Sequence, residues 1–208
     1  MYTYSRQKIS KKDIKSVVKQ IKTGYLTQGS KTKEFEEKLK FICGSKYCLV
    51  VNSATSALHI ALMALEVGQG DRVWTSPNTF VASSNAALYC GAQVNFVDID
   101  PDTYNMSVSA LREKLEHAEQ VGELPKVVIP VHLTGQSCDM RTIHELAQRF
   151  GFKVVEDASH AIGGGYCGKP IGNCAYSDIT VFSFHPVKIV TTAEGGMALT
   201  NHADLAKK

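Results

Sequence analysis

Lys126-Val127-Val128-Ile129-Pro130-Val131 and Lys153-Val154-Val155-Glu156 are two short β-rich runs, and the amphipathic stretch Met140–Phe150 stands between them. A strand, a helix and a second strand in this order are typical of a β-α-β unit, whose two strands run parallel in one sheet. The same alternation continues on both sides of this unit, from residue 46 onward. We therefore expect an α/β fold in which helices cover both faces of a mainly parallel sheet.

The expected sheet has seven strands. Hydrophobic periodicity places them at Tyr47–Val51, Arg72–Thr75, Gln93–Asp98, Lys126–Val131, Lys153–Glu156, Asp178–Phe184 and Gly196–Thr200. The last two strands have no helix between them, which allows one of them to run antiparallel. The expected helices are Ser10 or Lys11 to Lys22, Thr32–Ile42, Thr55–Leu65, Phe80–Tyr89, Val108–Ala118 and Met140–Phe150. In such sheets ligands bind beyond the carboxyl ends of the strands.

The composition is that of an ordinary globular protein, with 208 residues, 44% of them hydrophobic and 21% charged. The 23 basic and 20 acidic residues give a net charge of +3, which is too balanced to predict nucleic-acid binding. No run approaches the roughly 18 apolar residues of a membrane helix, and the N-terminus has no signal-peptide pattern. The six cysteines form no Cys-x-x-Cys pair, so we expect reduced thiols in a cytoplasmic protein, without disulfides or a metal site.

Lys188 and Asp157 each come just past the end of an apolar run. A lysine that loses hydration beside a strand end has a lowered pKa, and its free amine can attack a carbonyl carbon. An aspartate at a similar strand end can hold a proton on the ring nitrogen of a cofactor. The two groups together are what pyridoxal phosphate chemistry requires, although a lysine after a strand is by itself more often a solvated surface residue.

Other residues at the same sheet edge allow both a functional and a structural interpretation. Asn52-Ser53-Ala54-Thr55-Ser56-Ala57 follows a strand and starts a helix, which suits a phosphate but equally a simple helix cap. Phe80 could stack on a flat ring or belong to the core, and His160 could face the site or be structural. Ser183 could donate a hydrogen bond to a phosphate. The fingerprints of ordinary triphosphate and dinucleotide sites are absent from the sequence.

Taken in order, these motifs resemble those of the sugar aminotransferases that use pyridoxal phosphate, the DegT/DnrJ/EryC1/StrS family. The resemblance covers nearly the whole chain and is carried by Asn52–Ala57, Thr75–Asn85, Val97–Asp100, Glu156–Gly163, Phe182–Lys188 and Thr191–Gly196. Within the family, the segments Tyr4-Ser5, Leu26-Thr27-Gln28-Gly29, Asn52–Thr55 and Thr191–Gly196 look most like the pseudaminic-acid branch. That branch aminates C4 of a UDP-linked 4-keto-6-deoxy-N-acetylhexosamine.

The resemblance implies a role for each matching residue. Lys188 would attach covalently to the cofactor, Asp157 would pair with its ring nitrogen, and Phe80 would cover the ring. His160 would lie near the ring, and Ala54, Thr55 and Ser183 would hold the phosphate. The residues implied to meet the sugar nucleotide are Tyr4, Gly24, Tyr25, Leu26, Thr27, Ala54 and Ser183. A lysine rather than a histidine at position 188 favours amino transfer over dehydration, and glutamate is the donor implied by the family.

The resemblance also predicts how the chain is organised. We expect residues 1–30 to form an N-terminal helix and substrate loop, and residues 31–208 to form the cofactor-binding large domain, without the small C-terminal domain of the family. A homodimer is implied for the full-length form, and weak cofactor binding with little turnover is expected for these 208 residues alone. The alternatives are the same transfer to a dTDP-linked or arabinose-type 4-keto sugar, an inactive family member, and a flavodoxin-like nucleotide-binding domain.

Overall fold

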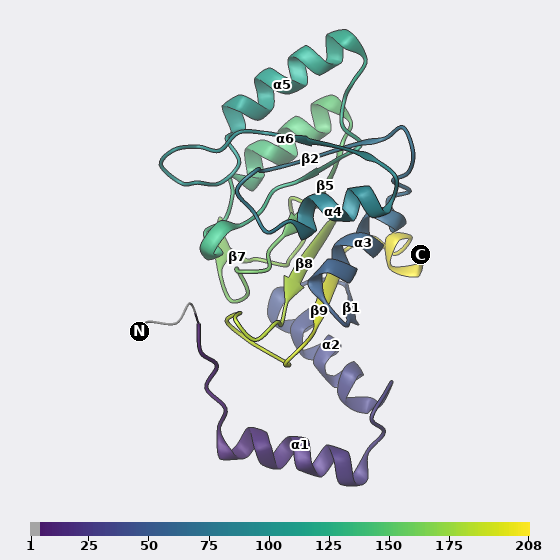
Figure 1. Cartoon of the computed structure of the whole chain (residues 1–208), viewed down its shortest axis with the longest axis vertical. Coiled ribbons are helices and arrows are strands. Elements are labelled where there is room, and N and C mark those ends of the chain that lie inside the picture. The colour runs from purple at the N-terminus through teal and green to yellow at the C-terminus, as the bar shows by residue number, and fades with distance from the viewer. Residues whose placement is uncertain (1–4) are drawn as a thin grey trace.

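A single seven-stranded sheet forms the centre of the computed structural model, which describes residues 5–208 (Figure 1). Tyr4 lies outside the described residues. The strands are β1 (Tyr47–Val51), β2 (Arg72–Thr75), β3 (Gln93–Phe96), β4 (Val127–Ile129), β5 (Lys153–Asp157), β8 (Ile179–Ser183) and β9 (Gly196–Thr200). The helices are α1 (Lys11–Thr23), α2 (Ser30–Cys43), α3 (Ala54–Ala64), α4 (Ala82–Tyr89), α5 (Val108–Val121) and α6 (Met140–Phe150). The predicted α/β class and the seven-stranded sheet are confirmed.

The strand order is β1-β9-β8-β5-β4-β2-β3. From β3 to β8 each neighbouring pair runs parallel, whereas β9 runs antiparallel to both β8 and β1. The strand that follows β8 without an intervening helix is therefore the antiparallel one, as the short connection allowed. This order brings the carboxyl ends of β5 and β8 side by side in the middle of the sheet.

Buried side chains cover both faces of the sheet. On one face α3 and α4 pack through Leu58, Leu62 and Ala86 against Val127 and Val181. On the opposite face α5 and α6 contribute a cluster of their own, formed around Leu111, Leu115, Ile143, Trp74 and Val154. Burying a large aliphatic or aromatic side chain contributes roughly 1.5–3 kcal/mol, so these two layers fix the sheet and the edge at which its strands end.

Several elements differ from the sequence-based expectation. The segment after β5 contains a two-stranded hairpin, β6 (Gly165–Tyr166) with β7 (Lys169–Pro170), which was not predicted because strands of two residues carry no periodicity. Short 3-10 helices occupy Leu133–Gly135 (η1) and Leu205–Lys207 (η2). Helix α4 begins two residues later than expected, which leaves Phe80 in the loop before it.

Helix α1 lies apart from the sheet, at the lower end of the molecule in Figure 1. It begins with a capping box in which the Ser10 side chain accepts from the Asp13 N–H and the Asp13 carboxylate accepts from the Ser10 N–H. Its apolar residues Ile14, Val17, Val18 and Ile21 are exposed. Helix α2, by contrast, packs through Leu39 and Cys43 against a third buried cluster that includes Phe182 and Phe184.

No helix within residues 5–208 is both long enough and apolar enough to cross a membrane.

Candidate active site

A cavity of about 620 Å³ opens at the edge where β5 and β8 end and α3 begins. Seven residues that the sequence assigned to the site line it together. They are Ala54, Thr55, Phe80, Asp157, His160, Ser183 and Lys188. The parallel arrangement explains this convergence, because the loops that follow parallel strands all leave the sheet at the same edge.

Lys188 is held in the connection between β8 and β9 by contacts at the base of this loop. The Phe184 N–H donates to the Gly195 carbonyl over 2.9 Å, and the Thr192 N–H donates back to the Phe184 carbonyl over 3.1 Å. The Lys188 N–H closes a turn onto the His185 carbonyl over 2.9 Å. Burial lowers the pKa of Lys188, and the nearby Asp157 carboxylate offsets only part of this effect. The lysine therefore carries a free amine at a lower pH than a solvated lysine.

Asp157 ends β5 and is only 5% exposed. Its Oδ2 atom accepts from the Ser83 hydroxyl over 2.7 Å, and its Oδ1 atom accepts from the Ser159 hydroxyl over 2.6 Å and from the Ser159 N–H over 3.2 Å. Each carboxylate oxygen can accept more than one hydrogen bond, so the group keeps capacity for a further donor from the cavity. A buried carboxylate of this kind is a partner for a protonated ring nitrogen.

The first turn of α3 faces the same cavity with Ala54 and Thr55. Ser53 caps the helix by accepting from the Ser56 N–H over 3.1 Å, so the first N–H groups of the helix remain available to a ligand. The helix start is pressed against Gly196, where an added Cβ would lie 2.2 Å from the Ser53 carbonyl carbon. The glycine thus allows β9 to approach the helix start, where N–H groups and the helix dipole favour an anion.

His160 lies in the loop after β5 and lines the cavity together with Lys188 and Asp157. Its Nδ1 atom accepts from the Thr134 N–H over 3.3 Å, which places the ring proton of the neutral form on Nε2. Burial and the Lys188 ammonium group lower the pKa of His160, and the Asp157 carboxylate opposes them. The imidazole is therefore neutral at neutral pH and offers one N–H donor.

Phe80 and Ser183 line the cavity from different elements. Phe80 is 73% exposed in the loop before α4, so its interpretation as a core residue is wrong. Ser183 is buried at the end of β8, and its Oγ atom accepts from the His185 N–H over 3.4 Å.

The loop between α1 and α2 does not reach the cavity. Tyr25 is 84% exposed and Leu26 is 77% exposed, and neither they nor Gly24 and Thr27 are among the residues that line it. The loop joins α1, which lies apart from the sheet, to the start of α2, which is the end of that helix that points away from the sheet (Figure 1). Contact between this loop and a sugar nucleotide remains a prediction. Within one chain, the loop does not line the cavity that holds the other site residues.

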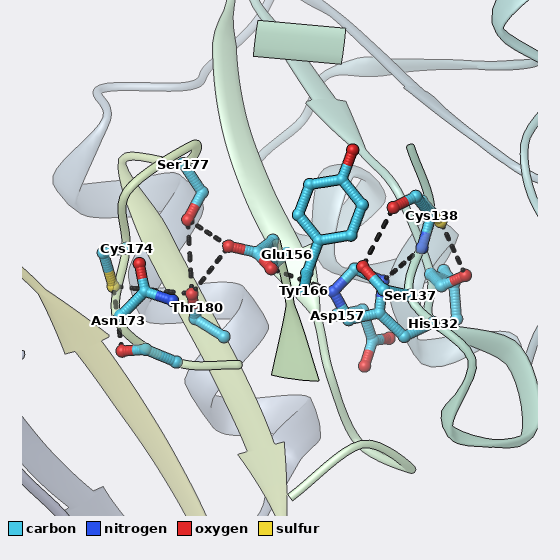
Figure 2. Close-up of polar contacts among 12 residues, drawn as sticks. His132, Ser137, Cys138, Glu156, Asp157, Tyr166, Asn173, Cys174, Ser177 and Thr180 are labelled. Atoms are coloured by element: carbon cyan, nitrogen blue, oxygen red, sulfur yellow. Dashed lines mark hydrogen bonds and ion pairs between the residues drawn. The ribbon is translucent and has the colours of Figure 1, made fainter. Parts of the chain in front are cut away.

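A buried polar network supports β5 from behind the cavity (Figure 2). The Nε2 atom of His132 lies 2.9 Å from Oε2 of Glu156, while the hydroxyls of Ser177 and Thr180 donate to Oε1 of Glu156. Burial alone would raise the pKa of Glu156, but these hydrogen bonds outweigh it and hold the pKa below its usual range. Successive residues of a strand point to opposite faces, so Glu156 faces this network while Asp157 faces the cavity.

The structure adds residues that the sequence left without a role. Ser83 and Ser159 both bond to the Asp157 side chain. An Asp-x-Ser pattern after a strand is typical of a turn in which the aspartate accepts from the residue two positions later, so Ser159 had a local signal. Ser83 had no such signal, because a serine among the small residues of a helix does not by itself indicate a contact with a distant side chain.

Comparisons with known proteins identify the relatives of this chain. The model of the DegT/DnrJ/EryC1/StrS aminotransferase family matches residues 7–208. The UDP-4-amino-4,6-dideoxy-N-acetyl-beta-L-altrosamine transaminase of Campylobacter jejuni is 42% identical over 209 residues, covering 100% of this chain and 54% of that protein. The chain spans about half the length of the curated relatives it matches.

Two solved structures share the fold over almost the whole chain. Helicobacter pylori PseC, an aminotransferase involved in the biosynthesis of pseudoaminic acid, superimposes with a TM-score of 0.89 at 33% identity, over 99% of this chain and 54% of that one. The Streptococcus pneumoniae protein Spr1654, in its PLP-form, gives a TM-score of 0.86 at 33% identity, over 98% of this chain and 53% of that one. From the matched motifs, the shared fold and the family model together, this chain belongs to the DegT/DnrJ/EryC1/StrS aminotransferase family.

Proposed function

We propose that this chain binds pyridoxal 5′-phosphate and carries the catalytic lysine of a nucleotide-sugar aminotransferase. The observation that supports this most directly is the presence of Lys188 and Asp157 in one cavity, with the pKa of the lysine lowered by burial. Because its pKa is lowered, this lysine has a larger fraction of free amine than a solvated lysine at the same pH, and a free amine can attack an aldehyde carbon. A buried carboxylate that lines a cavity can keep the ring nitrogen of a bound ligand protonated.

The residues fit this cofactor in three respects. The cavity volume of about 620 Å³ lies within the range of small-molecule and cofactor sites. The start of α3 offers backbone N–H groups at Ala54 and Thr55 for a phosphate, with the Ser183 hydroxyl on the neighbouring strand end. The exposed ring of Phe80 borders the same space and can cover a flat heterocycle.

When bound, this cofactor acts as an electron sink for the carbanion that forms when an amino donor loses its α-proton. Asp157 would keep the ring nitrogen protonated through a charge-assisted hydrogen bond. The Lys188 amine would hold the cofactor and would serve as the general base and acid that moves the α-proton of the donor. His160 supplies a neutral N–H donor beside them.

The acceptor in this proposal is C4 of a UDP-linked 4-keto-6-deoxy-N-acetylhexosamine, and glutamate is the amino donor. The names of the Campylobacter and Helicobacter relatives support the acceptor. We also propose that the protein works as a homodimer in its full-length form and that residues 1–30 form a unit distinct from the cofactor-binding residues 31–208. The exposed position of α1 supports this division. The six free cysteines support a reducing cytoplasm as its compartment.

Borohydride trapping followed by peptide mapping tests the cofactor assignment. The chain is incubated with pyridoxal phosphate and reduced with sodium borohydride, and the labelled peptide is identified by mass spectrometry. We expect label on Lys188 and its loss in Lys188→Ala. Lys153→Ala is the matched control, because Lys153 lies at the opposite end of β5. Label on another lysine, or equal label in Lys188→Ala and in the wild type, would show that the cavity is not the cofactor site.

A panel of 4-keto sugars linked to UDP, dTDP or GDP, offered with glutamate, tests the substrate. Preferential amination of the UDP-linked N-acetylhexosamine supports the proposal, and preference for a dTDP-linked or arabinose-type sugar replaces it. Label on Lys188 with no amination of any sugar by a full-length form would identify an inactive member of the family.

A further inference from the structure

Ser83 is completely buried in α4, and its hydroxyl donates to Oδ2 of Asp157 over 2.7 Å. The two residues are 74 positions apart in the sequence. Their contact crosses from the helix layer to the end of the central strand β5. Nothing in the packing of α4 requires a hydroxyl at this position, because its other buried residues, Ala82, Ala86 and Ala87, are alanines.

The main chain of Asp157 is fixed by the sheet, but its carboxylate is not. The Asp157 N–H donates to the Pro130 carbonyl, and the Asp157 carbonyl accepts from the His132 N–H, each over 3.0 Å. These main-chain bonds do not fix the side-chain torsions, and the terminal torsion of a carboxylate has a broad distribution. Its orientation depends on the groups that bond to its oxygens.

Ser159 and Ser83 hold the two oxygens in different ways. Ser159 bonds to Oδ1 within a local turn, from two positions further along the same chain segment. Ser83 bonds to Oδ2 from a separate helix, whose Ala86 and Ala87 are fully buried in the core of that face. Among residues 5–208, Ser83 is the residue from outside this turn whose side chain bonds to the carboxylate, so it ties the plane of the carboxylate to the helix layer on the sheet.

We propose that Ser83 is a positioning residue that aims the Asp157 carboxylate at the ring nitrogen of the cofactor. This inference rests on the proposed function. Through α4 the same contact couples the carboxylate at the floor of the cavity to the loop that carries Phe80, which borders the cavity from the other side. Ser83 itself is not among the residues that line the cavity, so it acts through Asp157.

The decisive experiment compares pyridoxal phosphate with 1-deazapyridoxal phosphate, in which a carbon replaces the ring nitrogen. Affinities of the wild type, Ser83→Ala and Ser84→Ala are measured by titration of ligand absorbance. Ser84 is the matched control, because it is the next residue of α4 and its hydroxyl donates to the Val81 carbonyl at the start of its own helix. We expect Ser83→Ala to weaken pyridoxal phosphate about tenfold, which corresponds to a loss of about 1.4 kcal/mol, within the range for a hydrogen bond to a charged group.

The deaza analogue distinguishes an effect of Ser83 on the orientation of the Asp157 carboxylate from a general effect of Ser83 on the fold. Because the analogue has no ring nitrogen, Ser83→Ala should change its affinity less than twofold, and Ser84→Ala should leave both ligands unaffected. Equal weakening of both ligands would mean that Ser83 only supports the fold, and unchanged affinity for both would mean that it has no role at the site. Either result overturns the inference.

A thermal double-mutant cycle on the ligand-free chain keeps this test independent of the proposed function. Tm is measured for the wild type, Ser83→Ala, Asp157→Asn and the double variant. Non-additive shifts support the coupling of Ser83 to Asp157, and additive shifts overturn it. If the wild type binds no pyridoxal phosphate, the proposed function fails, and the cycle alone then decides whether Ser83 fixes Asp157.

Discussion

The Nε2 atom of His132 and the Oε2 atom of Glu156 lie 2.9 Å apart, with His132 completely buried and Glu156 almost so. The Cys138 N–H points at Nδ1 of His132 over 3.2 Å, so Nδ1 accepts and the ring proton on Nε2 faces the carboxylate. Glu156 precedes Asp157 in β5, and His132 follows β4. The contact between His132 and Glu156 therefore fixes the end of β5, where Asp157 is the last residue.

Replacing His132 by alanine should destabilise the fold strongly. His132→Ala removes a donor from the buried Glu156 carboxylate and leaves a cavity, so we expect a loss of about 3 kcal/mol or more. Urea unfolding can be followed by the fluorescence of Trp74, which is the single tryptophan of the chain. His202→Ala is the control, because His202 is exposed, and it should change stability by less than about 0.5 kcal/mol. Similar losses of unfolding free energy in the two variants would contradict the interpretation that His132 stabilises the buried Glu156 carboxylate.

The contribution of Glu156 should disappear in acid. Its pKa in the folded chain lies below its usual range, so the folded state binds the proton more weakly than the unfolded state does. The stabilisation is therefore complete above the ordinary carboxyl pKa of about 4.3 and is lost as pH falls through the lower pKa of the folded state. Urea midpoints of the wild type and Glu156→Gln should differ at pH 7 and converge below about pH 4. A difference that is independent of pH would refute this.

Lys188 should react with amine reagents at a lower pH than exposed lysines do. Burial lowers its pKa, which increases the fraction of free amine at pH 8. Competitive acetylation with mass spectrometry, with the exposed Lys8 as reference, measures this directly. In Asp157→Asn the carboxylate that raises the pKa of Lys188 is gone, so acetylation at pH 8 should increase further. A decrease would show that Asp157 does not act on Lys188 by charge.

Phe80 should matter for the cofactor and not for the fold. Because its ring is 73% exposed, Phe80→Ala should change unfolding stability by less than about 0.5 kcal/mol. Loss of an aromatic contact of roughly 0.5–1.5 kcal/mol should weaken pyridoxal phosphate binding by up to about tenfold. Phe41→Ala is the control, since Phe41 is also exposed but lies on α2 outside the cavity. Equal affinities for the two variants would remove Phe80 from the site.

Gly196→Ala should disturb the start of α3. An added Cβ would lie 2.2 Å from the Ser53 carbonyl carbon and 2.4 Å from the Ala54 nitrogen, both of which are main-chain atoms that cannot rotate away. We expect a loss of stability of at least about 1–3 kcal/mol and weaker phosphate binding. Gly68→Ala, where an added Cβ meets nothing within 4 Å, should be close to neutral by the same urea assay. Wild-type stability in Gly196→Ala would mean that β9 and α3 can separate freely.

The sequence predicted the main elements well where periodicity was strong. The apolar runs at 47–51, 72–75 and 196–200 are strands with the expected bounds, and the amphipathic stretch Met140–Phe150 is a helix with the expected bounds. Short or aperiodic features escaped prediction. The β6–β7 hairpin is too short to show a pattern, and the short connection before β9 allows an antiparallel direction without requiring it.

The candidate site divides in the same way. Lys188, Asp157, Phe80 and Ser183 could be placed at one sheet edge from the sequence, because each lies at or beyond the end of a strand and parallel strands end together. Ser83 could not be found, since its contact with Asp157 spans 74 residues and depends on how α4 lies on the sheet.

By itself the sequence determined the alternation of strands and helices, the edge at which the polar residues gather, and the family. These follow from local periodicity and from the order of the motifs along the chain. Only the tertiary structure decided which side chains hold the Asp157 carboxylate, that Glu156 is locked to His132 behind the site, and that the loop at Gly24–Thr27 lies away from the cavity. Such contacts join residues far apart in the chain, and their existence depends on packing geometry that no local pattern encodes.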